Sequence, residues 1–189
     1  MKRNVMIIGG GASGMTAAIA AAREGADVVI LEHTKRPGKK LLSTGNGKCN
    51  LTNLDMRKDA FRGENPGFAW KVIEEVPVKE TLSFFEDLGL VLTDRNGYVY
   101  PAAGQASSVL DALRFELEHL KIPVLCECDV LGISKKLELR TTQGSMKADA
   151  VILAAGSKAA PGTGSDGSGY KLAESLGHRV IEPLPALVQ

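Results

Sequence analysis

Short apolar runs and helical segments alternate at the start of the chain. Residues 4–8 and 27–31 are mostly apolar runs, which is typical of strands buried on both faces of a sheet. Between them, residues 12–24 are rich in alanine, the strongest helix former, and Gly25 follows as a helix stop. The pattern therefore predicts a β-α-β unit.

The same patterns predict further elements along the chain. Helical spacing indicates helices over residues 67–75, 78–88, 107–120 and 170–176. In the third of these, Ser107 or Ser108 can serve as N-cap, and the apolar face consists of Val109, Leu110, Leu113, Leu117 and Leu120. The segment LVLTDRNGYVYP predicts a hairpin that turns at Asn96-Gly97. Strands are expected over residues 124–126, 130–134, 137–142 and 150–153, with TTQGSMK as a turn.

Composition narrows the class of protein. The 189 residues are 44% hydrophobic and 24% charged, which is enough for one globular core with room for a small appendage. The formal net charge of +1 leaves no broad basic field for nucleic acid or an anionic membrane. We therefore expect neither of those partners, and any charged ligand must be met by local charges.

Three cysteines, Cys49, Cys126 and Cys128, cannot all pair with one another and show no zinc-site spacing. Reduced thiols and a cytoplasmic location are the simplest interpretation. On a strand, Cys126 and Cys128 would face the same side, which favours a buried structural role over a redox or metal pair. The basic, apolar N-terminus resembles a signal peptide, but its four glycines argue against that interpretation.

The glycines at the N-terminus have a more specific explanation. Gly9, Gly11 and Gly14 form the pattern G-x-G-x-x-G between a predicted strand and a predicted helix. In dinucleotide-binding folds these positions make the tight turn, admit the pyrophosphate and let the helix pack on the strand. Glu32 ends the second strand, where an acid binds a ribose diol and repels a 2′-phosphate. The motif predicts a site for FAD or NAD rather than NADP.

Two later segments carry less specific signals. KKLLSTGNGKCNLTN, residues 39–53, resembles a phosphate-binding P-loop but lacks its first glycine at Leu42 and has Cys49 where Ser or Thr is required. ADAVILAAGS is a strand that ends in small residues, and these would let a backbone pass close to a cofactor.

Five segments together carry a family resemblance. VMIIGGGASGMTAAIAA, KKLLSTGNGKCNLTN, GYVYPAAGQASSVLDAL, ADAVILAAGS and GTGSDGSGYKLAESLGHRVIEPLPALV occur in this order along nearly the whole chain. They resemble a bacterial family of NAD(P)/FAD-dependent, aminoacetone-oxidase-like oxidoreductases, some of which act in bile-acid dehydroxylation. The family is similar to glutathione reductase and fumarate reductase flavoproteins. The resemblance implies an α/β, Rossmann-like FAD-binding domain with a small β-rich element, and FAD as cofactor.

The resemblance also implies a set of cofactor-binding residues. The loop after Glu32 would fold back over the cofactor and bring a cation, glycines and amides to the flavin. The set is Gly9, Gly11, Ala12, Ser13, Gly14, Glu32, Lys40, Thr44, Gly45, Asn46, Gly47, Cys49, Val130, Ala154, Ala155 and Gly156. The chain departs from the family at Thr44, at Lys48, and at Ala155-Gly156-Ser157, where the family usually has Ser, Arg and Thr-Gly-Gly.

The expected protein is therefore a flavin-dependent oxidoreductase. Hydride would pass between FAD and a small organic substrate, with NAD(P)H as a candidate donor; catalytic residues, substrate and oligomeric state stay open. By the resemblance, residues 1–189 are the N-terminal portion of an FAD-binding domain, without the inserted substrate domain and the returning C-terminal segment, and such a fragment would be inactive alone. The alternatives are an NAD-binding regulatory module and a non-catalytic interaction domain.

Overall fold

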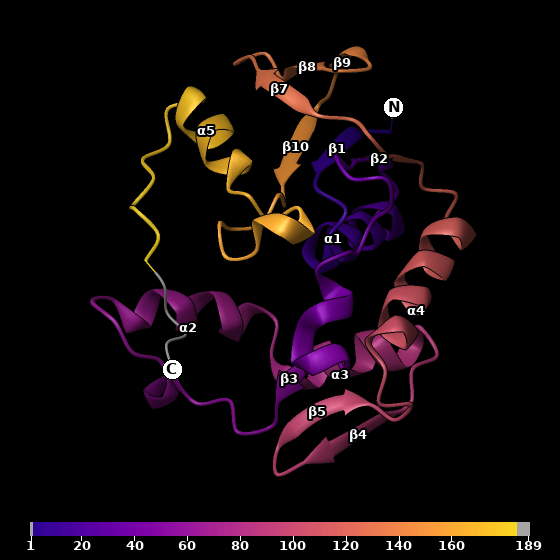
Figure 1. Cartoon of the computed structure of the whole chain (residues 1–189), viewed down its shortest axis with the longest axis vertical. Helices are drawn as coiled ribbons and strands as arrows, with labels where there is room; N and C mark the ends of the chain where they lie inside the picture. Colours follow the sequence, from indigo (N-terminus) through magenta and orange to yellow (C-terminus); the bar gives the residue numbers. More distant parts are fainter. Residues whose placement is uncertain (1, 185–189) are drawn as a thin grey trace. The chain divides into compact units, whose positions relative to one another are not determined.

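A four-stranded parallel sheet carries the predicted glycine motif. The computed structural model describes residues 2–184 (Figure 1), so the end of the predicted apolar tail lies outside the described residues. The sheet has the order β10-β1-β2-β6, formed by Ala150–Leu153, Asn4–Ile8, Asp27–Leu31 and Val124–Leu125. Helix α1, Ala12–Arg23, connects β1 to β2 and packs against both. The predicted β-α-β unit is confirmed.

Both faces of the parallel sheet are covered, which explains its continuous apolar strands. Side chains of β1 alternate between the two faces. Ile7 is fully buried, as are Met15 and Ile19 of α1. Met6 and Ile8 belong instead to a core cluster with Leu31, Cys128, Ile133, Leu139, Ala148 and Leu172. That cluster joins the sheet to an antiparallel sheet and to helix α5.

The antiparallel sheet has the order β7-β8-β9, formed by Val130–Ile133, Glu138–Thr141 and Gly144–Lys147. The prediction of a turn over TTQGSMK is wrong for its second half, because Gly144–Lys147 pairs with β8 as a strand. Its residues are mostly exposed and only Met146 is apolar, so no alternating pattern revealed it. Cys128 is buried in the core, as predicted; Cys126 is half-buried, and Glu127 between them has a φ of 54°, so the pair does not lie on a strand.

Helix α5, Ser168–Ser175, begins two residues before its predicted start. The Ser168 backbone N–H donates to the Asp166 carboxylate (2.9 Å), which orders the chain ahead of the helix. This bond, followed by one from the Ser168 hydroxyl, lowers the pKa of Asp166 below its usual range. A short 3₁₀ turn, Pro161–Thr163, precedes this region.

The chain divides into two compact units. The first contains the elements above and comprises the residues up to Leu41 and from Leu113 onward; the second is Leu42–Ala112. The second unit has the sheet β3-β5-β4, formed by Thr52–Asn53, Tyr98–Pro101 and Leu92–Arg95, and helices α2, Pro66–Glu75, and α3, Val78–Asp87. A short 3₁₀ turn, Lys58–Ala60, precedes α2. Positive φ angles at Asn96 (54°) and Gly97 (86°) confirm the predicted hairpin turn.

Helix α4, Ala106–His119, runs from the second unit into the first. Val109, Leu110, Leu113 and Leu117 are buried, which confirms four of the five positions of the predicted apolar face. The fifth, Leu120, lies just past the end of the helix and is half-buried. The predicted cap is wrong, because the helix starts one residue earlier. The Ser108 hydroxyl, inside the first turn, donates to the Gln105 carbonyl (2.8 Å).

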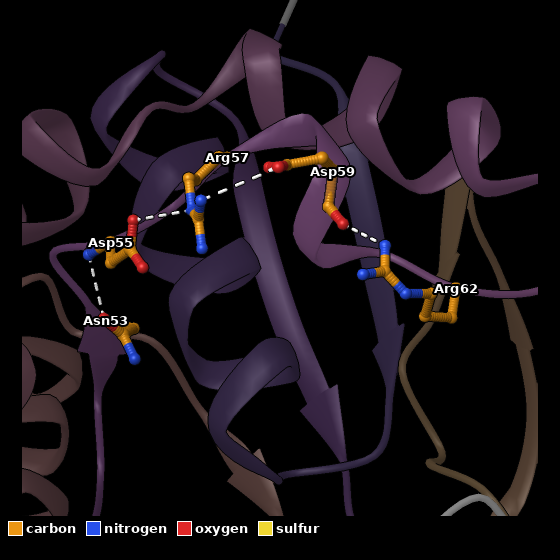
Figure 2. Close-up of polar contacts among 5 residues, drawn as sticks. All are labelled: Asn53, Asp55, Arg57, Asp59 and Arg62. Atoms are coloured by element: carbon orange, nitrogen blue, oxygen red, sulfur yellow. Dashed lines mark hydrogen bonds and ion pairs between the residues drawn. The ribbon is translucent and has the colours of Figure 1, made fainter.

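A row of charged side chains follows β3 in the second unit. Figure 2 shows Arg57 between the carboxylates of Asp55 (2.9 Å) and Asp59 (3.6 Å), while Arg62 donates to the Asp59 backbone carbonyl. The side chains of Asp55, Arg57 and Asp59 are more than half exposed, so water and salt screen the two ion pairs and each contributes little to stability.

Across residues 2–184, no helix has the length and apolar character required to cross a membrane.

The core cluster generates a stability prediction. Leu139 is fully buried, whereas Leu131 on the neighbouring strand is 53% exposed. We expect Leu139→Ala to lower the free energy of unfolding by about 2–5 kcal/mol, since it leaves a cavity. Leu131→Ala is the matched control and should change the free energy by about 0.5 kcal/mol or less. Urea unfolding measures both, and similar losses would contradict this description of the core.

Candidate cofactor-binding site

Three backbone segments meet at the carboxyl end of the parallel sheet. Strand β1 lies between β10 and β2 (Figure 1), so the segments that follow these three strands are neighbours. They are the glycine turn at residues 9–11, Glu32 and the loop after it, and the small residues at 154–156. Ligands of open α/β sheets bind at this edge.

Close packing explains two of the three motif glycines. Gly9 has a φ of +107°, and a Cβ there would lie 2.5 Å from the Ala154 carbonyl oxygen. A Cβ at Gly14 would lie 1.9 Å from the Gly9 carbonyl oxygen. Neither position has room for a side chain, because the opposing atoms belong to the backbone.

Gly11 is different, because a Cβ there would meet nothing within 4 Å. Gly11 is the N-cap of α1; no side chain caps the helix among the described residues, and its first turn contains no acidic residue. Ala12 and Ser13 are exposed. The first N–H groups of α1 and the positive end of its dipole are therefore open to an anion in front of Gly11. This fits the pyrophosphate of a dinucleotide.

Glu32 is buried and held by two backbone donors. It is 7% exposed, its Oε2 accepts the Gly10 N–H (2.6 Å), and its Oε1 accepts the Thr34 N–H (2.7 Å). These bonds fix the carboxylate, and no ion pair to it is found among residues 2–184. Each carboxylate oxygen can accept more than one hydrogen bond, so the group can still accept bonds from the hydroxyls of a ribose.

The segment after β10 continues the sheet and then turns. The Ala154 N–H donates to the Ile8 carbonyl (2.8 Å), which places Ala154 beside the glycine turn. Gly156 has a φ of +80°, and a Cβ there would lie 2.8 Å from the Ser165 hydroxyl. The predicted close approach of small residues to the site is thus consistent with the backbone geometry.

Lys40 also belongs to the first unit. Its Nζ donates to the Ser165 hydroxyl (3.2 Å), and Ser165 is only 5% exposed. Sequence reasoning missed Ser165, Thr34 and the Gly10 N–H. The position of Gly10 between two motif glycines was a signal that could have identified it. The contact of Lys40 with Ser165 joins residues 125 positions apart, so no local sequence pattern predicts it.

Five predicted residues, Thr44, Gly45, Asn46, Gly47 and Cys49, lie in the second unit around the 3₁₀ segment Leu41–Gly47. Gly45, Asn46, Gly47 and Cys49 all have φ between 53° and 80°. Left-handed conformations at non-glycine residues are strained and cluster at functional sites. The loop is held by the Cys49 N–H on the Thr44 carbonyl (3.0 Å).

The thiol of Cys49 is buried, at 6% exposure. Burial raises the pKa of this thiol, and a hydrogen bond with Thr44 opposes part of the increase. The thiol therefore stays protonated near neutral pH, which disfavours a nucleophilic or redox role.

The structure thus groups the predicted residues of the first unit, with two exceptions. Lys40 lies in the loop after β2 and contacts Ser165. Gly9, Gly11, Ala12, Ser13, Gly14, Glu32, Ala154, Ala155 and Gly156 gather at the carboxyl end of the parallel sheet. Val130 instead begins β7 and packs, half-buried, against the core cluster. The roles of all these residues toward a cofactor stay predictions.

Comparison with known proteins identifies the family. The HI0933-like protein Rossmann domain matches residues 3–184. The chain belongs to this family.

Two relatives extend the comparison. The chain is 49% identical over 188 residues to a 3-dehydro-bile acid delta(4,6)-reductase of Clostridium scindens, covering 97% of the chain and 46% of that protein. It is 27% identical to a ribosomal RNA dihydrouridine synthase of Escherichia coli, covering 98% of the chain and 47% of that protein. The chain thus spans about half the length of the curated relatives it matches.

Solved structures agree on the fold. A 3-ketosteroid-delta4-(5alpha)-dehydrogenase from Rhodococcus jostii aligns with a TM-score of 0.70 at 17% identity, over 93% of the chain and 54% of that structure. The open form of a flavocytochrome c3 fumarate reductase aligns with a TM-score of 0.65 at 18% identity, over 93% and 40%. The predicted Rossmann-type α/β fold is confirmed.

The motif glycines generate a paired prediction. Gly14→Ala should lower the free energy of unfolding by about 1–3 kcal/mol, because its Cβ meets backbone. Gly11→Ala should leave stability nearly unchanged, because its Cβ meets open space, yet weaken FAD binding at least about tenfold, equivalent to about 1.4 kcal/mol. Urea unfolding and FAD titration measure the two effects. If Gly11→Ala binds FAD normally, the space in front of α1 does not hold the pyrophosphate.

A second prediction concerns Cys49. Because burial raises the pKa of its thiol, alkylation by iodoacetamide should reach half its limiting rate at a higher pH in the folded protein than in urea. Mass spectrometry of the Cys49 peptide across a pH series gives both midpoints. The midpoint does not depend on access to the thiol, so equal midpoints would show that Cys49 is not in a desolvated site.

Proposed function

We propose that this chain is the FAD-binding part of a flavin-dependent reductase that transfers hydride to a small organic substrate. The open N-terminus of α1, next to the buried Glu32, is the observation that carries the proposal. An anion site and a hydrogen-bond acceptor lie at the same sheet edge, as a pyrophosphate and its neighbouring ribose require.

The two ends of the proposed site bind different parts of FAD. The N–H groups at the start of α1 bind the pyrophosphate, and Gly11 admits it. Glu32 accepts the ribose hydroxyls and repels a 2′-phosphate. For the flavin end we propose the small residues 154–156 that follow β10.

Two relatives suggest the reaction. Their names describe a reductase of delta(4,6) bonds and a synthase of dihydrouridine, and both products arise by adding hydrogen across a carbon–carbon double bond. Bound FAD supplies hydride chemistry. We propose a substrate whose double bond is conjugated to a carbonyl, so that hydride adds to the β-carbon and a proton to the α-carbon. NAD(P)H is the proposed source of electrons.

A small, largely apolar substrate is favoured over RNA. The relative named for bile acids is 49% identical, whereas the one named for ribosomal RNA is 27% identical. RNA binding depends on many cationic contacts to phosphates, and the chain has 23 basic and 22 acidic residues. A bile-acid-like enone is therefore the first substrate class to test.

The test uses the full-length protein. A flavin absorbance spectrum and mass spectrometry of the released cofactor should identify FAD. Anaerobic mixing with NADH or NADPH should bleach the flavin, and a 3-oxo bile acid with a conjugated double bond should restore the oxidised spectrum, while its saturated analogue should not. Bound NAD without flavin would establish the regulatory module instead, and absence of both would indicate an interaction domain.

A substitution of Glu32 tests its proposed contact with the ribose of FAD. Glu32→Ala should weaken FAD binding about tenfold or more, because a hydrogen bond to a charged group contributes about 1.5–3 kcal/mol. Glu24→Ala, at the exposed end of α1, is the control and should bind FAD normally. Since Glu32 also holds Gly10 and Thr34, unfolding of the cofactor-free proteins must be measured alongside. An unchanged dissociation constant for FAD would refute the ribose assignment.

A further inference from the structure

Two loops of the first unit border the glycine turn. The post-β2 loop, residues 32–40, and the post-β10 loop, residues 154–167, follow the strands on either side of β1. In Figure 1 the post-β10 loop is the orange-yellow segment between β10 and α5. The post-β2 loop lies directly on the turn, because the Gly38 N–H donates to the Gly10 carbonyl (2.8 Å).

Two lysines of the post-β2 loop bind the post-β10 loop. Lys39 Nζ donates to the Gly162 carbonyl (2.8 Å), and Lys40 Nζ donates to the Ser165 hydroxyl (3.2 Å). The Ser165 hydroxyl in turn donates to the Ser157 carbonyl (2.7 Å). Lys39 is exposed, whereas Lys40 is half-buried and Ser165 buried, so the Lys40 contact is better protected from water.

The post-β10 loop is folded on itself around the same serine. Ser165 forms an isolated bridge with Ala160, with its N–H on the Ala160 carbonyl (3.3 Å). The loops also approach closely at Gly164, where a Cβ would lie 2.8 Å from His33 Nε2. Ser165 therefore both holds the post-β10 loop in its own fold and accepts the hydrogen bond from Lys40 of the post-β2 loop.

We propose that Lys40 is a positioning residue that latches the post-β10 loop to the post-β2 loop through Ser165, and that this latch slows release of a bound dinucleotide. The second half rests on the proposed function. A dinucleotide at the glycine turn is bordered by both loops, and tying them together opposes the separation that release requires. Lys40 then acts through Ser165 and not by direct contact with the flavin.

Amide hydrogen exchange of the cofactor-free, full-length protein tests the latch itself. Lys40→Met and Ser165→Ala should each raise exchange in residues 157–166 about tenfold, and Lys40→Arg should restore much of the protection. Lys35→Met, an exposed lysine of the same loop, is the control and should leave exchange unchanged. Unchanged exchange in Lys40→Met would overturn the latch, whether or not the protein binds FAD.

Rates of FAD release, measured after dilution or by exchange with a flavin analogue, test the consequence. Lys40→Met and Ser165→Ala should each speed release about tenfold while association changes little, and the double variant should release no faster than either single one. Faster release in Lys40→Met alone, with Ser165→Ala normal, would show direct cofactor contact and overturn the proposal. If no FAD binds to the parent protein, the proposed function fails, and the exchange result still decides the latch.

Discussion

The site depends on the close approach of backbone at the glycine turn. Gly9 touches the end of β10, and Gly14 brings the first turn of α1 against Gly9. No side chain fits between them, so the helix starts directly at the sheet edge. As a result, the N–H groups of α1 point at the place where the strands end. The proposed anion site is thus a direct consequence of helix-to-sheet packing, and Gly11 is the one motif glycine whose absent side chain leaves open space.

The carboxylate of Glu32, next to that helix, is buried and needs polar partners in place of water. A carboxylate that loses contact with water requires hydrogen bonds or a counter-charge. Glu32 has two backbone donors, and one of them is Gly10 within the turn itself. The same bonds aim the carboxylate and hold the turn. Its structural role and its proposed binding role are therefore linked, which is why its substitution has to be judged against the stability of the cofactor-free protein.

Local sequence signals predicted the elements whose causes are local. Continuous apolar runs identified β1, β2 and β10, helical spacing identified the buried face of α4, and Asn96-Gly97 identified the hairpin turn. Strand β9 escaped prediction because it is a mostly polar edge strand, held by pairing with β8. Helix α5 starts early because of Asp166. The contact of Lys40 with Ser165 joins polar residues far apart in sequence, and no periodicity encodes such a pair.

The predicted site residues thus obey two different constraints. At the glycine turn, Gly9 and Gly14 are required because backbone occupies the space of a side chain. In the loop of Thr44 to Cys49, Asn46 and Cys49 adopt left-handed angles that glycine would adopt without strain. If conformation alone mattered, glycine would suit both positions better. At Cys49, burial of the side chain and its hydrogen bond with Thr44 offset part of this strain. For Asn46 the strain is smaller, because asparagine adopts the left-handed region several times more often than most other non-glycine residues.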